Sequence, residues 1–213
     1  MKIIDGKLLA TNLNEELRKK ILLYKDKYGK KPHLVVVLVG DNQASQVYVN
    51  NKEKKAVEVG IKSTIIRLSN MTTEDNLLKT IDECNSDNSV DSILVQLPLP
   101  NHINSNKVID RINIEKDVDG FNSKNIGLLA LGRPKVIPCT PLGCYKMLES
   151  ILDIEGKNVL ILGRSNIVGK PLSYLLTNKN ATVTIAHSKT SNLKSLCLSN
   201  EIIIAAIGKA NFL

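Results

Sequence analysis

The chain has 213 residues, 43% of them hydrophobic and 23% charged, which is typical of a globular protein with one large domain or two small ones. A net charge of +8 favours anionic partners, but the lysines are spread along the chain and only 3% of the residues are aromatic, which argues against a nucleic-acid-binding module with stacking platforms. The composition favours a phosphorylated or carboxylated small molecule as the partner.

The N-terminal half alternates helical and strand patterns. Apolar residues spaced by four from Leu9 to Ile21 share one face of a helix that we expect to end near Gly29. The run His33–Val39 is almost entirely apolar and β-branched, as in a strand buried on both faces of a parallel sheet. The pattern repeats with a helix over residues 45–60, a strand over 61–68, a helix over 73–84 and a strand over 90–96. This alternation predicts βαβ units with right-handed crossovers and a parallel sheet.

Tyr48 and Lys52 stand one turn apart in the helix predicted over residues 45–60, which Gly60 would end as a left-handed C-cap. A phenol ring offers a flat stacking surface. A buried amine can exchange protons when its surroundings favour the neutral form. The alternative is a solvated, lysine-rich helix face on which Tyr48 covers the core, and the pair alone does not decide between them.

Gln96 ends the strand predicted over residues 90–96 and is followed by Leu97-Pro98-Leu99-Pro100. In open α/β sheets, ligands bind at the carboxyl ends of the strands, and two prolines remove backbone donors from the loop there. We therefore predict that the Gln96 side chain is presented to a ligand. It could instead satisfy backbone groups at the strand end.

The segment Lys116–Phe121 forms an acidic turn with Asp117 and Asp119. No further acidic or histidine residue stands at a spacing suited to a metal, so we predict no metal site. Asp119 is a candidate binding residue because it follows the Tyr48/Lys52 helix and the strand-end Gln96 in chain order. A solvated turn is the alternative.

The segment Pro138–Gly143 predicts a hinge before a helix over residues 144–152, and we place the domain border here, giving domains 1–141 and 142–213. The strand over 158–163 runs into a turn with Gly163 and Gly169 and then a helix, which is how a dinucleotide-binding βαβ unit cradles phosphate. The glycine spacing departs from the usual G-x-G-x-x-G. A second strand over 181–186 follows at the distance that this unit requires.

The end of that second strand indicates which dinucleotide is bound. An NAD site usually places Asp or Glu there to hold the ribose 2′-hydroxyl, whereas this chain has His187, Ser188 and Lys189. Arg164 stands in the preceding turn. Cations and a hydroxyl suit a 2′-phosphate, so NADP is the predicted cofactor. His187 as a packed surface residue remains an alternative.

The cysteines and the N-terminal segment indicate the compartment. The four cysteines lack paired Cys-x-x-Cys spacing, and we interpret them as reduced thiols of a cytoplasmic protein. The polar start at residues 1–6 predicts no signal peptide, and no apolar run approaches the roughly 20 residues that span a bilayer.

Seven segments carry a resemblance that extends along the whole chain. They are Ser45–Lys52, Val95–Pro100, Lys116–Phe121, Pro138–Gly143, Gly163–Pro171, Ala186–Thr190 and Ile204–Lys209. In this order they resemble the bifunctional methylenetetrahydrofolate dehydrogenase/cyclohydrolase family. The resemblance implies NADP-dependent oxidation of 5,10-methylenetetrahydrofolate to 5,10-methenyltetrahydrofolate, followed by hydrolysis to 10-formyltetrahydrofolate.

The resemblance also implies roles for the matched residues. Tyr48 would stack on the aminobenzoyl part of the folate, and Lys52 would transfer protons in the cyclohydrolase step. Gln96 would hydrogen-bond Lys52, Asp119 would bind the pterin, and Leu97–Pro98 would adjoin the substrate. The implied NADP site comprises Thr140, Gly163, Arg164, Ser165, Ile167, Gly169, His187, Ser188, Ala206 and Gly208.

The implied fold is α/β with two domains, an N-terminal three-layer α/β catalytic domain and a C-terminal Rossmann-type NADP-binding domain, with the active-site cleft between them. A homodimer through the cofactor domains is implied as well. Family members continue past the position of Leu213, so we expect a C-terminally truncated chain with an incomplete cofactor domain and an open sheet edge. The alternatives are an inactive or binding-only remnant of that enzyme and a shikimate-dehydrogenase-like NADP oxidoreductase.

Overall fold

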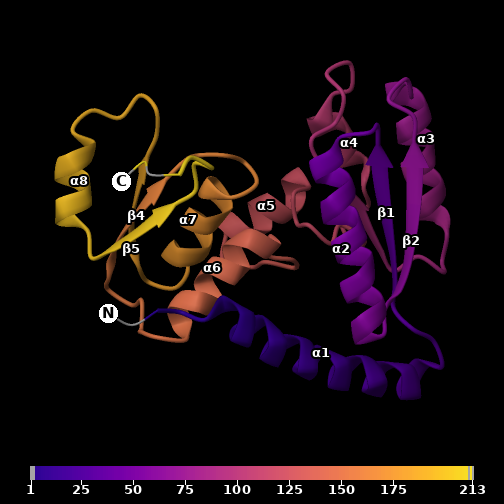
Figure 1. Ribbon diagram of the computed structural model, residues 1–213, viewed down its shortest axis with the longest axis horizontal. Helices are drawn as coiled ribbons and strands as arrows, with labels where there is room; N and C mark the ends of the chain where they lie inside the picture. Colours follow the sequence, from indigo (N-terminus) through magenta and orange to yellow (C-terminus); the bar gives the residue numbers. More distant parts are fainter. Residues whose placement is uncertain (1–2, 211, 213) are drawn as a thin grey trace. The chain divides into compact units, whose positions relative to one another are not determined.

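A computed structural model describes residues 3–210 and 212. The chain forms two compact units, one over Asp5–Val118 and one that holds the remaining described residues, chiefly those from Asp119 onward. Each unit contains three parallel strands flanked by helices (Figure 1). The predicted α/β class with parallel sheets is confirmed. The compact units divide between Val118 and Asp119, while the border at residues 141–142 stays a prediction.

The first unit is a three-stranded parallel sheet with strand order β2-β1-β3. The first strand in sequence is central, and Val36 lies opposite Ile65 on one side and Leu94 on the other. The elements are α1 (Gly6–Tyr28), β1 (His33–Val39), α2 (Gln43–Val59), β2 (Lys62–Leu68), α3 (Glu74–Ser86), β3 (Ser92–Val95) and α4 (Ser105–Arg111).

Alternating residues of β1 form two separate cores, because successive side chains of a strand point to opposite faces. Val35 and Val37 pack with Leu77 of α3 and with residues of α4. Val36 and Leu38 pack with Val49 of α2 on the other face. Figure 1 shows α2 and α3 on opposite sides of these strands. The sheet is thus the middle of three layers, as predicted.

Two glycines end helices where the sequence predicts it. Gly29 after α1 and Gly60 after α2 are both left-handed, with φ of 67° and 99°. A left-handed residue with no Cβ ends a helix at little steric cost, which explains both positions. Asn42 caps the other end of α2 by accepting a hydrogen bond from the Ser45 amide at 3.0 Å.

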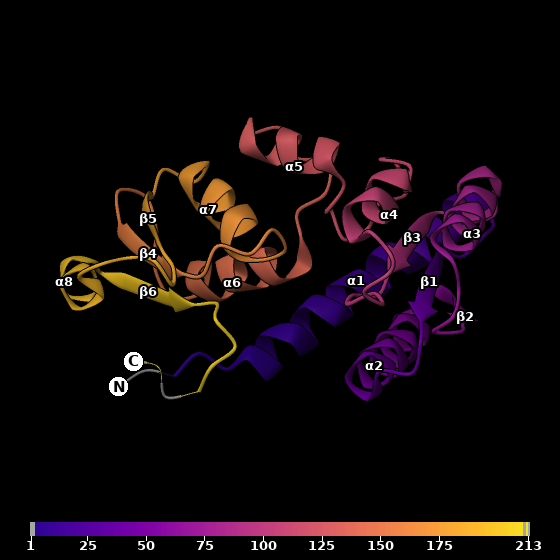
Figure 2. The ribbon, with the colours of Figure 1, turned by 90° about the horizontal axis from the view of Figure 1, so that it is seen from above.

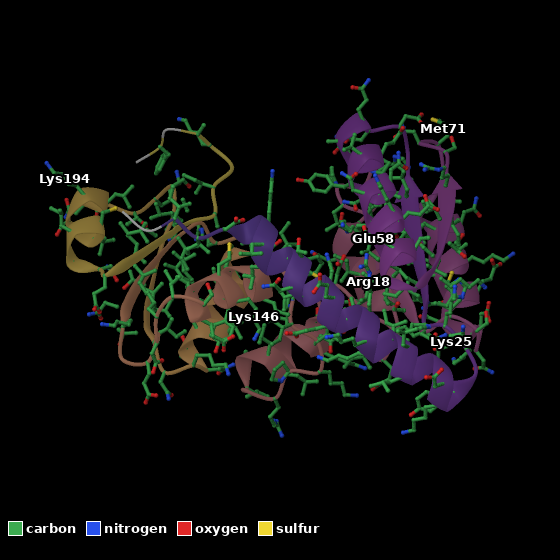
Figure 3. The ribbon with its side chains drawn as sticks, turned by 60° about the horizontal axis from the view of Figure 1, so that its bottom comes forward. Arg18, Lys25, Glu58, Met71, Lys146 and Lys194 are labelled. Carbon is green, nitrogen blue, oxygen red and sulfur yellow. The ribbon has the colours of Figure 1, made fainter. Side chains whose placement is uncertain are left out.

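Helix α1 is long but contributes little to the core, since only Ile21 is buried. Arg18 Nη2 donates to Glu58 Oε1 at 2.6 Å, which ties α1 to the end of α2 (Figure 3). Among the residues that the structure describes, no helix is both long and apolar enough to cross a membrane.

The second unit repeats the topology of the first, with strand order β5-β4-β6, all parallel. Helices α6 and α7 cover one face of the sheet, and α8 covers the other (Figure 2). The elements are α5 (Ser123–Ala130), α6 (Cys139–Glu149), β4 (Asn158–Leu162), α7 (Gly169–Thr177), β5 (Thr182–Ala186), α8 (Leu193–Ser199) and β6 (Ile202–Ala205). Asn178 Nδ2 donates to the carbonyl oxygen of Leu129 at 2.6 Å, which fixes α5 to the end of α7.

The predicted hinge over residues 138–143 is wrong, because helix α6 begins at Cys139 rather than at Cys144. Pro141 is buried within its first turn. Proline is tolerated there since the first amides of a helix have no acceptor inside the helix. The short helices α4, α5 and α8 were not predicted, because seven or eight residues are too few to show a clear apolar period.

Gly163 and Gly169 are required by close backbone packing at the turn after β4. A Cβ added at Gly163 would lie 2.6 Å from the carbonyl oxygen of Ala206, and Gly163 also has a φ of 121°. A Cβ added at Gly169 would overlap the carbonyl group of Gly163. This turn therefore holds β4, β6 and the start of α7 together through glycine contacts.

We expect Gly169→Ala to destabilise the protein by about 2–4 kcal/mol, because backbone atoms must move to admit the methyl group. Urea unfolding of the full chain measures the change. Gly143→Ala is the matched control, since a Cβ at this helical position meets nothing within 4 Å. It should be neutral or stabilise by about 0.5–1 kcal/mol. A Gly169→Ala protein as stable as the wild type would show that the contact is not tight.

Candidate functional site

Lys52 and Gln96 form a hydrogen-bonded pair in the first unit. Lys52 Nζ, on α2, donates to Gln96 Oε1 at 3.2 Å, just past the carboxyl end of β3. Gln96 Nε2 donates to the carbonyl oxygen of Leu97 at 2.7 Å, before the cis Leu97–Pro98 peptide bond. The nitrogen of Gln96 satisfies a backbone group, as the alternative interpretation expected, while its oxygen faces the lysine. Presentation of Gln96 to a ligand stays a prediction.

Tyr48 lies one turn before Lys52 on α2 and is exposed, with a relative accessibility of 63%. Lys52 is half-buried, so the expectation of a buried amine is only partly met. The reason is the placement of α2, which turns Val49 toward the sheet and leaves the flanking positions 48 and 52 at the border of the packed face. The Tyr48 ring is open to a flat ligand.

The acidic segment, predicted as a turn, lies partly beside β3. Asp117 is 2% exposed and bridges to Ile93, so the backbone of residues 116–118 runs beside β3. Asp119 is half-buried and opens the second compact unit. Its role in pterin binding stays a prediction. In residues 3–210 and 212, no three or more His, Cys, Asp or Glu side chains gather as they would around a metal ion.

A pocket of about 340 Å³ lies at the carboxyl ends of the strands in the second unit. Its lining comprises Leu162, Gly163, Arg164, Ala186, His187, Ser188, Leu193, Ile207, Lys209 and Phe212. Four of these, Gly163, Arg164, His187 and Ser188, are predicted cofactor residues. The strand order places the pocket at the switch point of the sheet, where the chain leaves the central strand β4 first toward β5 and then toward β6. Open α/β sheets bind ligands at this position.

The other predicted cofactor residues do not line this pocket. Ser165, Ile167 and Gly169 belong to the turn and the start of α7, and Thr140 is exposed in the first turn of α6. The Ala206 carbonyl packs on Gly163, and Gly208 is left-handed with a φ of 61°. Contact of these residues with a cofactor stays a prediction.

Sequence reasoning missed Lys209 and the apolar wall of Leu193, Ile207 and Phe212. Lys209 follows β6 directly after a glycine, so the rule that ligands bind at strand ends would have found it. Leu193 lies at the start of α8, a helix too short to be predicted. Ile207 and Phe212 carry no polar signal.

The cations of the pocket are not neutralised by neighbours. Within the described part of the chain, neither Arg164 nor Lys209 forms an ion pair, whereas Lys157 is paired with Glu201 at 2.7 Å. Residues 119–213 contain eleven Lys or Arg and five Asp or Glu, so most of the net charge of +8 belongs to this half. An unpaired cation at an apolar pocket attracts an anionic ligand. The donor set fits a phosphorylated dinucleotide.

The amides at the start of α7 already have acceptors within the chain, and the phosphate cradle at this turn stays a prediction. Ser165 Oγ accepts from the amides of Val168 at 3.1 Å and Gly169 at 3.4 Å, and the Lys170 amide donates to the Ser165 carbonyl at 3.1 Å. Pro171 has no amide proton. The sequence could not show this capping, because it depends on how the turn folds back on itself.

Two family models match the chain. The model of the tetrahydrofolate dehydrogenase/cyclohydrolase catalytic domain matches residues 4–119. The model of the NAD(P)-binding domain of the same family matches residues 138–213. The first match contains Lys52 and Gln96, and the second contains the pocket.

Relatives and solved structures are similar over nearly all of the chain. The bifunctional protein FolD of Streptococcus uberis is 52% identical over 211 residues, which are 99% of this chain and 74% of that protein. The FolD methylenetetrahydrofolate dehydrogenase/cyclohydrolase of Campylobacter jejuni is 45% identical with a TM-score of 0.97, covering 100% of this chain and 76% of that one. The Trypanosoma brucei FolD structure, complexed with NADP and an inhibitor, is 33% identical with a TM-score of 0.93, covering 98% of this chain and 72% of that one. The chain thus spans about three quarters of the length of these relatives, and the expected truncation stays a prediction.

We expect Gln96→Leu to lower the free energy of unfolding by about 1–2 kcal/mol, because the bonds to Lys52 and Leu97 are both lost. Urea unfolding measures the loss. Gln43→Leu, at the exposed start of α2, is the control and should change stability by less than about 0.5 kcal/mol. Equal stability of the Gln96→Leu and wild-type proteins would mean that the pair contributes nothing.

Proposed function

The chain belongs to the tetrahydrofolate dehydrogenase/cyclohydrolase family, and from this premise we propose that it oxidises 5,10-methylenetetrahydrofolate with NADP and hydrolyses the product to 10-formyltetrahydrofolate. The observation that carries the proposal is the hydrogen bond of Lys52 to Gln96 inside the match to the catalytic domain. The relatives at about 50% identity are bifunctional FolD proteins. A remnant or a shikimate-dehydrogenase-like enzyme is therefore not favoured.

Lys52 serves the cyclohydrolase step in this proposal. Water adds to the methenyl carbon and loses both of its protons as the formyl oxygen forms. One proton reaches the ring nitrogen whose bond to that carbon breaks, and the other is released to the solvent. The half-buried amine of Lys52, held by the neutral amide of Gln96, transfers these protons in the proposal. Gln96 positions the amine through its bond to Leu97.

The remaining residues of the first site bind the folate. The exposed Tyr48 ring supplies the stacking surface for the aminobenzoyl group. Leu97 and Pro98 adjoin the substrate beside Gln96, and Asp119 accepts hydrogen bonds from the pterin. The family match and the position of Gln96 at a strand end support these assignments.

The pocket of the second unit binds NADP in this proposal. Bound there, the dinucleotide would supply the hydride acceptor for the methylene carbon. Arg164, His187 and Ser188 hold the 2′-phosphate, which a carboxylate at the end of β5 would repel. The turn from Gly163 to Gly169, together with Thr140, Ser165, Ile167, Ala206 and Gly208, orients the dinucleotide. We extend the proposal to a cytoplasmic homodimer that takes part in purine biosynthesis, on the family resemblance.

We expect Lys52→Met to reduce cyclohydrolase activity by about 10²- to 10⁴-fold, because it removes the group that transfers the proton. Hydride transfer should persist. Formation of NADPH and loss of the methenyl chromophore measure the two steps separately. Lys54→Met, which changes an exposed lysine on the same helix, is the control. If both activities survive in Lys52→Met, Lys52 has no catalytic role.

We expect Arg164→Ala to weaken binding of NADP by about 10- to 100-fold and to change NAD binding far less, since a charge-assisted bond to the 2′-phosphate is lost. Titration of both dinucleotides measures the ratio. Lys179→Ala, past the far end of α7, removes an exposed cation that does not line the pocket. Equal losses for the two dinucleotides would refute the 2′-phosphate assignment.

A further inference from the structure

The turn after β4 leaves a dinucleotide diphosphate without its usual partner. In dinucleotide-binding βαβ units the diphosphate sits at the N-terminus of the helix after the first strand, against unbonded amides. Here Ser165 occupies the amides of Val168 and Gly169, the Lys170 amide donates to the Ser165 carbonyl, and Pro171 has no amide proton. The start of α7 therefore has little left to donate, and a cation must supply the missing charge.

Lys209 is the cation in position to do this. It lines the same pocket as Gly163 and Arg164. It lies past the carboxyl end of β6, directly after the left-handed Gly208. Its ammonium lies 5.9 Å from the centroid of the Phe212 ring, which also lines the pocket. In the described part of the chain it has no carboxylate partner, so its charge is available to a ligand.

We propose that Lys209 binds the diphosphate bridge of the dinucleotide, in place of the helix amides that Ser165 occupies. The proposal rests on NADP binding as proposed above and assigns a residue that the family match does not. The strand order separates the two proposed phosphate sites. The 2′-phosphate residues His187 and Ser188 follow β5, on one side of the central strand β4, while Lys209 follows β6 on the other side.

The apolar part of the pocket agrees with this division. Leu193 and Ile207 offer surface to an adenosine ring system, and among the residues that the structure describes no carboxylate side chain lines the pocket. An adenosine group there has the 2′-position on the His187 side and its 5′-phosphates over the turn, toward Lys209. The two cations then contact different phosphates of one molecule.

Three probes test the assignment by calorimetric titration of the full chain. ADP carries the diphosphate but no 2′-phosphate, 2′-AMP carries the 2′-phosphate but no diphosphate, and NADP carries both. We expect Lys209→Met to weaken the binding of ADP and NADP by about tenfold and to leave the binding of 2′-AMP unchanged. Arg164→Ala should weaken the binding of 2′-AMP and NADP and leave the binding of ADP unchanged. Lys209→Arg should retain most of the ADP affinity.

Lys194→Met is the matched control, because Lys194 lies on the outward face of α8 and does not line this pocket (Figure 3). Unchanged 2′-AMP binding also shows that the Lys209→Met protein is folded. The proposal is overturned if Lys209→Met leaves ADP binding unchanged, if it weakens 2′-AMP as much as ADP, or if the wild-type protein binds none of the probes. If the variants show the expected pattern of binding but the wild-type protein lacks enzyme activity, only the proposed function is overturned.

Discussion

The constraint on which both units depend is a parallel sheet whose first strand is central. Strand order is β2-β1-β3 in one unit and β5-β4-β6 in the other, so the chain leaves the central strand to either side in turn. Parallel strands end at one edge, and the divergence of the crossovers leaves space there. Gln96 stands at that edge in the first unit, and Arg164, His187 and Lys209 stand there in the second. The polar residues of each unit are gathered by topology, although they are far apart in the sequence.

The chemistry of Lys52 depends on the kind of partner that it has. Lys107, at the surface, donates to Glu74, and this carboxylate raises the pKa of Lys107 and keeps it charged. Lys52 instead donates to the neutral oxygen of Gln96. The bond from Gln96 Nε2 to the Leu97 carbonyl orients the amide so that its oxygen faces the lysine.

The second unit shows how one capping serine redistributes a binding role. Ser165 stabilises the turn after β4 by accepting from two amides, and it thereby removes them from any ligand. The close packing of Gly163 on Ala206 brings the end of β6 next to that turn. A lysine just past β6 is then able to replace the amides with a positive charge. Stability of the turn and recognition of an anion are thus divided between different residues.

The parts of this fold that the sequence predicts are those with a strong local cause. The buried run of β1 and the glycine caps at Gly29 and Gly60 depend on side-chain pattern and steric freedom alone. The start of α6 was missed because prolines and a glycine resemble a hinge whether or not the segment is helical. The capping by Ser165 was missed because it depends on how the turn folds back on itself, and Lys209 was missed although its place after β6 follows the rule that ligands bind at strand ends.

A crystal structure of the full chain with NADP and a folate analogue bound would test the central claim most directly. We expect the folate to lie against Tyr48 with its one-carbon group beside Lys52 Nζ. We also expect NADP to lie across the turn after β4, with its 2′-phosphate at Arg164 and its diphosphate at Lys209. A folate bound away from α2, or a dinucleotide bound away from the carboxyl ends of β4, β5 and β6, would contradict it.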